Sequence, residues 1–149
     1  MSVHEVVAPE SIRILTSLLN TPSPTGFVDR AAGLVEEELR AYSDTSISRT
    51  RKGAVVAKWA GTADTNPRAL TAHLDTLGAV VKEIKTNGRL RLSAVGGLNW
   101  NSVEAEGVTI VTAGGKSVRG SCMYHKPSMH VYSKEELDAK RDETSMEVR

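Results

Sequence analysis

The spacing of apolar residues predicts two helices in the first forty positions. Ile12, Leu15 and Leu19 recur at the intervals of one helical face, and Pro9 just before them suits a first helical turn. After a break rich in Pro and Ser, a second apolar stripe follows the same period; it consists of Val28, Ala31, Ala32, Val35 and Leu39. We therefore expect two amphipathic helices joined by the segment 20–26.

The pattern changes to a period of two after residue 45. Residues 46–51 and 54–59 flank the turn Lys52-Gly53 and predict a hairpin. The run 69–74 is short and mostly apolar, which predicts a buried strand ending at Asp75. Helix, helix, hairpin and buried strand together are typical of the opening of an α/β or α+β domain.

The helical period disappears after about residue 78, and two more hairpins are predicted. The first turns at Asn87-Gly88, a pair that readily takes positive φ angles, and the second turns at Gly114-Gly115. Ser133 and Glu136 have the spacing of a capping box, which predicts a short helix to about Arg141. We therefore divide the chain into an α/β part, residues 1–78, and a β-rich part, residues 79–149.

The last four residues, 146–149, alternate like a strand and then stop. A strand without a neighbour leaves its backbone groups unpaired. We therefore expect the partner of this strand to follow Arg149 in a longer protein, of which this chain is the N-terminal portion.

Composition restricts the class of protein. The 149 residues contain 19 Lys and Arg against 18 Asp and Glu, and 4% are aromatic, so neither a basic nucleic-acid surface nor an aromatic stacking platform is expected. No apolar run approaches the length of a membrane span, and the N-terminus has no signal-peptide pattern. The single Cys allows no internal disulfide, which fits a cytoplasmic location.

His73 and Asp75 are the strongest candidates for chemistry. Two residues apart at the end of the predicted strand, they would point the same way, and ligands of open α/β sheets bind beyond the carboxyl ends of strands. His is a natural ligand of zinc or cobalt, and a nearby carboxylate can fix its tautomer. A lone His-x-Asp is more often a structural or incidental pair, so the spacing alone leaves both interpretations open.

The other candidates are weaker. His125 and His130 flank a Pro, and loop packing or an interface is favoured there over a metal site because no Cys or carboxylate has matching spacing. Cys122 follows the pattern of a buried, inert thiol. Gly114-Gly115-Lys116-Ser117 is best explained as a hairpin turn, since the first Gly and the helix of a phosphate-binding loop are missing.

Several segments together resemble the tetrahedral-type (glutamyl/deblocking) metalloaminopeptidases, which belong to the larger clan of dinuclear zinc peptidases. The resemblance covers nearly the whole chain, and its segments occur in family order: 21–26, 51–53, 70–82, 84–90, 95–97, 125–132 and 146–149. It implies a partial zinc-peptidase-like α/β catalytic domain (1–78), followed by an inserted, small β-barrel-like dimerisation domain (79–149) that is incomplete at its C-terminus.

The resemblance also implies a function and a site. Relatives hydrolyse N-terminal residues from peptides with a water activated by two divalent metal ions, zinc or cobalt. His73 matches the first metal ligand, and Asp75 matches the catalytic-site carboxylate that supports this ligand. The β-rich domain implies a homo-oligomer.

The remaining ligands of the family follow the inserted domain, and no residue of this chain matches them. We therefore expect at most weak metal binding and little or no peptidase activity from these residues alone. The alternative is a non-catalytic oligomerisation or interaction module with a vestigial metal site. The ordered resemblance disfavours a third interpretation, a metal-independent α+β domain.

Overall fold

The computed structural model describes residues 3–63 and 65–149, with the backbone alone for residues 3–8. The chain divides into two compact units, Met1–Thr76 and Leu77–Arg149, called here the N-terminal unit and the C-terminal unit. Their functional assignment to a catalytic domain and a dimerisation domain remains a prediction.

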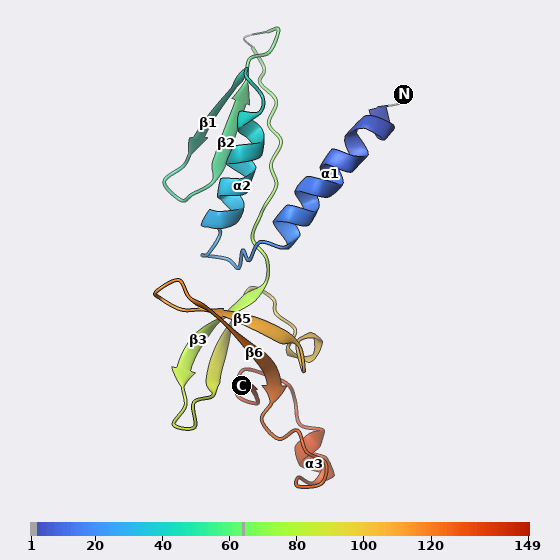
Figure 1. Cartoon of the computed structure of the whole chain (residues 1–149), viewed down its shortest axis with the longest axis vertical. Coiled ribbons are helices and arrows are strands. Elements are labelled where there is room, and N and C mark those ends of the chain that lie inside the picture. Colours follow the sequence, from blue (N-terminus) through green and yellow to red (C-terminus); the bar gives the residue numbers. More distant parts are fainter. Residues whose placement is uncertain (1–2, 64) are drawn as a thin grey trace. The chain divides into compact units, whose positions relative to one another are not determined.

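The N-terminal unit contains two helices and one hairpin (Figure 1). They are α1 (Val3–Leu19), α2 (Asp29–Arg40), β1 (Thr45–Arg49) and β2 (Val55–Trp59). The strands β1 and β2 are antiparallel, and α2 contacts both of them. The two helices and the hairpin predicted from periodicity are therefore confirmed.

The apolar face predicted for α1 is wrong. Ile12, Leu15 and Leu19 are mostly exposed, whereas Ile14 and Leu18 line an apolar groove against α2. The helix also begins six residues before Pro9, which lies inside it. Two apolar stripes of similar spacing compete on this helix, and only the position of α2 decides which of them is covered.

The buried strand predicted for residues 69–74 is also wrong. This segment is extended but has no ladder of strand partners in the described part of the chain, and the Leu70 side chain is fully exposed. A strand needs a neighbour to pair its backbone groups. The nearest pairing is an isolated bridge between Pro24 and Thr76.

The C-terminal unit is built on one antiparallel sheet. Its elements are β3 (Gly78–Ile84), β4 (Leu90–Val95), a 3₁₀ turn η1 (Trp100–Ser102), β5 (Gly107–Val111), β6 (Ser117–Tyr124), α3 (Lys134–Leu137) and β7 (Met146–Val148). Both predicted hairpins are confirmed, with Gly88 and Gly115 at positive φ in their turns. The strands lie in the order β3-β4-β7-β6-β5.

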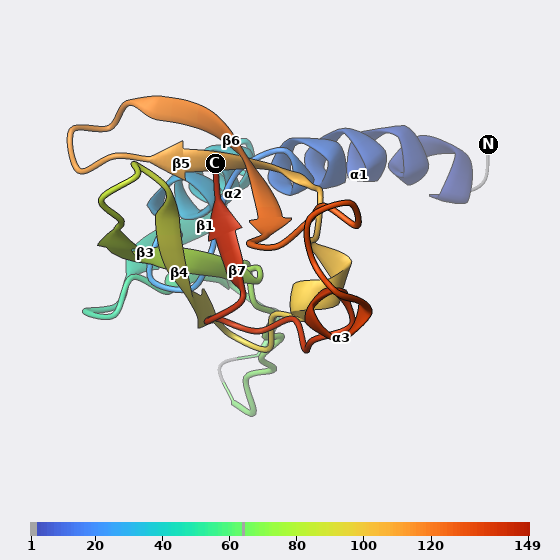
Figure 2. The same ribbon diagram turned by 90° about the horizontal axis from the view of Figure 1, so that it is seen from below.

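The position of β7 contradicts the expectation that its partner follows Arg149. The strand β7 pairs with β4 on one side, through Leu90 and Val148, and with β6 on the other (Figure 2). All three of its residues are buried. Because two earlier strands already flank it, its alternation carries no information about sequence that follows.

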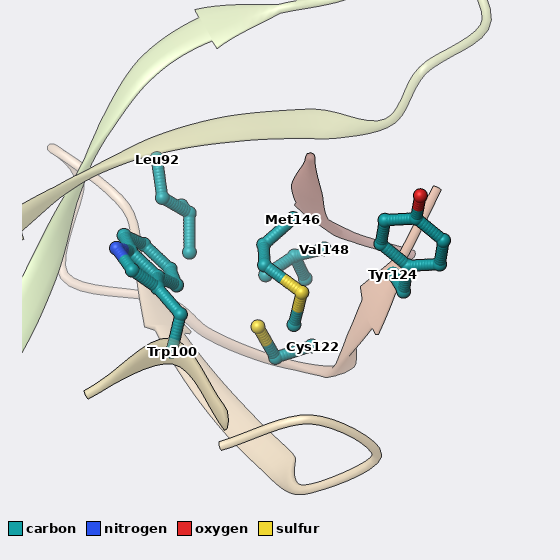
Figure 3. Close-up of a cluster of buried hydrophobic side chains, with 6 residues drawn as sticks. All are labelled: Leu92, Trp100, Cys122, Tyr124, Met146 and Val148. Carbon is teal, nitrogen blue, oxygen red and sulfur yellow. The ribbon is translucent and has the colours of Figure 1, made fainter. Parts of the chain in front are cut away.

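The core of the C-terminal unit collects around β7. Six buried side chains form it, from β4, η1, β6 and β7 (Figure 3): Leu92, Trp100, Cys122, Tyr124, Met146 and Val148. Cys122 is buried as predicted. Burial raises the pKa of its thiol, and the nearby Glu104 carboxylate adds to this effect.

The capping box before α3 is confirmed. The Ser133 hydroxyl accepts from the Glu136 backbone N–H, and the Glu136 carboxylate accepts from the Ser133 backbone N–H. The helix ends at Leu137, before the predicted end at Arg141. The Arg141 side chain bonds instead to the carbonyl of Ala139 and to the carboxylate of Glu104, outside any helix.

The fold is therefore a mixed α/β arrangement, while closure of the sheet into a barrel and its use in dimerisation remain predictions. No helix among the described residues is both long enough and apolar enough to cross a membrane.

Candidate functional site

His73 and Asp75 contact each other in the extended segment that precedes the C-terminal unit. The His73 Nδ1 atom lies 3.1 Å from Asp75 Oδ1 and 3.0 Å from the Asp75 backbone oxygen. Both neighbours are acceptors, so we assign the ring hydrogen to Nδ1. The His73 side chain is 86% exposed, and its Nε2 lone pair is then free to bind an electrophile such as a metal ion.

A loop between the two helices holds this segment in place. The Thr76 backbone N–H donates to the Ser23 carbonyl at 2.8 Å, and the Ser23 hydroxyl donates to the Leu74 carbonyl at 3.0 Å. The Thr25 hydroxyl donates to Asp75 Oδ2 at 2.6 Å. These three bonds replace the strand pairing that the sequence predicted for this segment.

The carboxylate of Asp75 is held in its charged form. The hydrogen bond from Thr25 is the main reason that the pKa of Asp75 lies below its ordinary value, and the His73 ring adds a smaller effect in the same direction. A charged Asp75 is the better acceptor for the Nδ1 hydrogen of His73.

The pair fits one part of a metal site. An exposed imidazole nitrogen, with its other nitrogen bonded to a carboxylate, is the usual arrangement of a His metal ligand. A stable zinc site needs three or four protein ligands, however, and the described residues contain no cluster of three His, Cys, Asp or Glu side chains. The pair could therefore supply one imidazole donor and a carboxylate beside it, and a complete centre needs further donors.

His125 and His130, the other histidines whose side chains the structure describes, do not form a second centre. His125 stacks on Tyr124 with ring centroids 4.9 Å apart, and its backbone N–H bonds to the Ser145 carbonyl. His130 is exposed. These contacts favour loop packing over a metal site for His125.

Sequence reasoning placed the His-Asp pair but missed Ser23 and Thr25. In the sequence, the segment 20–26 indicates a break between helices, and no local pattern gives its hydroxyl groups a partner. The available signal was a Ser and a Thr on either side of Pro24, because such side chains often bond to nearby backbone or carboxylate groups in loops.

The fold is shared with solved aminopeptidases. A TET aminopeptidase from a marine sediment archaeon of the Thaumarchaeota superposes with a TM-score of 0.80 at 22% identity, over 95% of this chain and 38% of that chain. An aminopeptidase from the archaeon Desulfurococcus kamchatkensis gives 0.78 at 23% identity, over 94% and 37%. The TET1 peptidase of Pyrococcus horikoshii gives 0.69 at 21% identity, over 93% and 39%. The architecture is thus that of the N-terminal portion of a TET-type aminopeptidase.

Sequence comparison then defines the family. Residues 53–149 match the model of the M42 glutamyl aminopeptidases. The chain is 39% identical over 140 residues to "Putative aminopeptidase YhfE" of Bacillus subtilis (strain 168). The aligned region covers 94% of this chain and 40% of that protein. The chain belongs to the M42 glutamyl aminopeptidase family, and the resemblance found in the sequence is confirmed. The chain spans about 40% of the length of this curated relative.

Proposed function

We propose that this chain is the N-terminal portion of a metal-dependent aminopeptidase that removes N-terminal residues from peptides. Membership of the M42 family is the observation that carries this proposal. His73 and Asp75 lie within the matched residues and present an imidazole with a free Nε2 atom. A cytoplasmic location is part of the same proposal and rests on the single, buried Cys122.

The roles of the two residues follow from their contacts. His73 Nε2 serves as one metal ligand, and Asp75 holds the ring with its hydrogen on Nδ1. Two divalent ions, zinc or cobalt, would lower the pKa of a bound water and polarise the peptide carbonyl. Asp75 acts through His73 and does not bind the metal itself. Its contribution is to orient the imidazole ring and to raise the basicity of Nε2.

The 149 residues alone should bind metal weakly and turn over little peptide. They supply one imidazole and one supporting carboxylate, whereas a two-metal centre needs several more donors. The test is an aminoacyl-p-nitroanilide assay on the pure chain with Co²⁺ or Zn²⁺. Turnover well above that of the free metal would contradict this part of the proposal.

Metal binding at His73 is tested separately by NMR. Paramagnetic Co²⁺ should broaden the imidazole signals of His73 at lower concentration than those of His130, an exposed histidine of the C-terminal unit. The substitution His73→Gln should remove the tighter response, and His130→Gln should leave it unchanged. Equal broadening of both residues would contradict a ligand role for His73.

A second function, self-association through the C-terminal unit, has its own observation. This unit has its own antiparallel sheet and buried core, while β3 at the edge of the sheet exposes Val80 (57%) and Ile84 (73%). Exposed apolar strand edges favour pairing with another chain. The Pyrococcus horikoshii TET1 peptidase can assemble into a tetrahedron or a large octahedral shell.

Sedimentation of the pure chain tests this second function. We expect a dimer or larger assembly that the double substitution V80K and I84K converts to monomer. The matched substitution Val118→Lys, on an exposed residue of β6, should leave the assembly intact. A wild-type chain that stays monomeric at high micromolar concentration would exclude homo-oligomerisation by these residues.

A further inference from the structure

The two oxygens of Asp75 face different partners. Oδ2 accepts from the Thr25 hydroxyl at 2.6 Å, and Oδ1 lies 3.1 Å from His73 Nδ1. A carboxylate bonded at one oxygen only can rotate about its Cβ–Cγ bond, whereas one bonded at both has a fixed plane. Thr25 therefore determines the direction in which the Asp75 carboxylate presents Oδ1 to the imidazole. The Asp75 backbone oxygen, 3.0 Å from Nδ1, is a second acceptor that does not depend on Thr25.

Hydrogen bonds, and not packing, restrain His73. Its side chain is 86% exposed, and its segment has no ladder of strand partners among the described residues. The backbone around it is held by the bonds from Ser23 to Leu74 and from Thr76 to Ser23. Ser23 is only 2% exposed, so the loop that carries Thr25 is itself firmly placed.

We infer that Thr25 is a positioning residue, which acts through Asp75 to keep the His73 hydrogen on Nδ1 and leave Nε2 free for a ligand. This inference rests on the role proposed above for His73. It predicts that a hydroxyl group is required at position 25, while the methyl group of Thr25 is dispensable. Ser23 has the complementary task of holding the backbone, because its bonds reach main-chain atoms only.

The test measures the tautomer of His73 in the metal-free 149-residue chain. Long-range ¹H–¹⁵N spectra distinguish the protonated from the unprotonated ring nitrogen for each histidine. Thr25→Val removes the hydroxyl at nearly constant volume. It should move the Nδ1 and Nε2 shifts of His73 part of the way toward those of the exposed His130, because the Asp75 backbone oxygen still accepts from Nδ1. Thr25→Ser should restore the wild-type shifts.

The control variant is Thr21→Val, in the same loop. The Thr21 hydroxyl donates to the Ser17 carbonyl and has no contact with Asp75, so this variant should leave the His73 shifts unchanged. Backbone amide spectra check that each variant is folded. Unchanged His73 shifts in folded Thr25→Val would overturn the inference, as would loss of the wild-type shifts in folded Thr25→Ser.

A Co²⁺ titration separates this inference from the proposed function. Thr25→Val should weaken the Co²⁺ response of His73 by about 5-fold, which is less than the roughly 10- to 100-fold usual for loss of a direct partner of a metal-binding His, because Thr25 acts one contact further away, through Asp75. Equal responses in wild type and Thr25→Val would overturn the role of Thr25 while leaving His73 as a ligand. A wild-type chain without a specific response would contradict the metal role of His73, and the metal-free spectra would then decide the role of Thr25.

Discussion

The Glu147 carboxylate accepts a hydrogen bond from the Lys85 ammonium group at 2.8 Å, although 62 residues separate them in sequence. Arg89 donates to the other oxygen of Glu147 at 2.6 Å, and Arg149 donates to this same oxygen at 3.1 Å. The Glu147 side chain is buried, while its cationic partners remain partly exposed. This network joins β7 to the β3-β4 hairpin. The backbone pairing between β4 and β7 consists of a single residue pair, Leu90 and Val148.

Glu147→Gln should lower the free energy of unfolding of the C-terminal unit by about 2 kcal/mol, because buried hydrogen bonds to charged groups are among the strong ones. Urea unfolding followed by Trp100 fluorescence measures this in a Trp59→Phe background, where Trp100 is the remaining Trp. The control is Glu83→Gln, since Glu83 makes an exposed pair with Arg91 and should contribute less than about 1 kcal/mol. Equal effects of the two substitutions would contradict the network's role.

The contribution of Glu147 should disappear in acid. Burial raises its pKa, but hydrogen bonds from Lys85 and Arg89 outweigh this effect, so the pKa lies below the ordinary 4.5. A carboxylate with a lowered pKa stabilises the folded state above its unfolded-state pKa and stops doing so as the pH falls through its folded-state pKa. The difference in unfolding free energy between wild type and Glu147→Gln should be constant above about pH 5 and shrink below it. A difference that persists unchanged to about pH 3 would exclude this linkage.

Met146→Ala should destabilise the C-terminal unit by about 3 kcal/mol, because it leaves a cavity in the core around β7. Met129→Ala provides the matched control, since its side chain is exposed and its loss should change stability by less than about 0.5 kcal/mol. The same Trp100 fluorescence assay measures both variants. Similar stabilities of the two would mean that β7 is not buried in solution.

Gly120→Ala should cost about 2 kcal/mol through overpacking. A Cβ atom at this position would lie 2.7 Å from Val148 Cγ1 and 2.9 Å from the Arg149 backbone oxygen, so β6 and β7 would have to separate. Gly97→Ala is the control, because its Cβ would meet nothing within 4 Å. Urea midpoints of the two variants give the comparison, and a tolerated Gly120→Ala would argue against the close β6-β7 approach.

Leu18→Ala should destabilise the N-terminal unit by about 1.5 kcal/mol, whereas Leu15→Ala should change its stability by less than about 0.5 kcal/mol. Leu18 lines the groove between α1 and α2, and Leu15 is 55% exposed. Circular dichroism at 222 nm reports mainly on this unit, since α1 and α2 have 17 and 12 residues and α3 has 4. A larger loss for Leu15→Ala would show that the other face of α1 is the packed one.

Local physics made several elements predictable. Asn87-Gly88 and Gly114-Gly115 determine their hairpins because a tight turn needs positive φ angles, which Gly adopts without strain. Ser133 and Glu136 determine the start of α3 because both bonds of a capping box lie within four residues. The amphipathic period determines α2, whose Ala31 and Ala32 are buried.

The candidate site was predictable only in part. The spacing of His73 and Asp75 sufficed to select the pair, because residues two apart in an extended segment lie on the same side. Their support by Thr25 joins positions 50 residues apart, and no local pattern encodes such a contact. The extended but unpaired state of residues 69–74 has the same origin, since a strand depends on its neighbours as much as on its own residues.

By itself, then, the sequence determined the helices, the turns, the capping box and the family. The tertiary structure decided which face of α1 is covered, where β7 is inserted, and how Asp75 is anchored. The first set depends on interactions within a few residues, which composition and spacing express directly. The features decided by the tertiary structure depend on which distant segment of the chain packs against each element. The residue pattern of an element does not specify that partner.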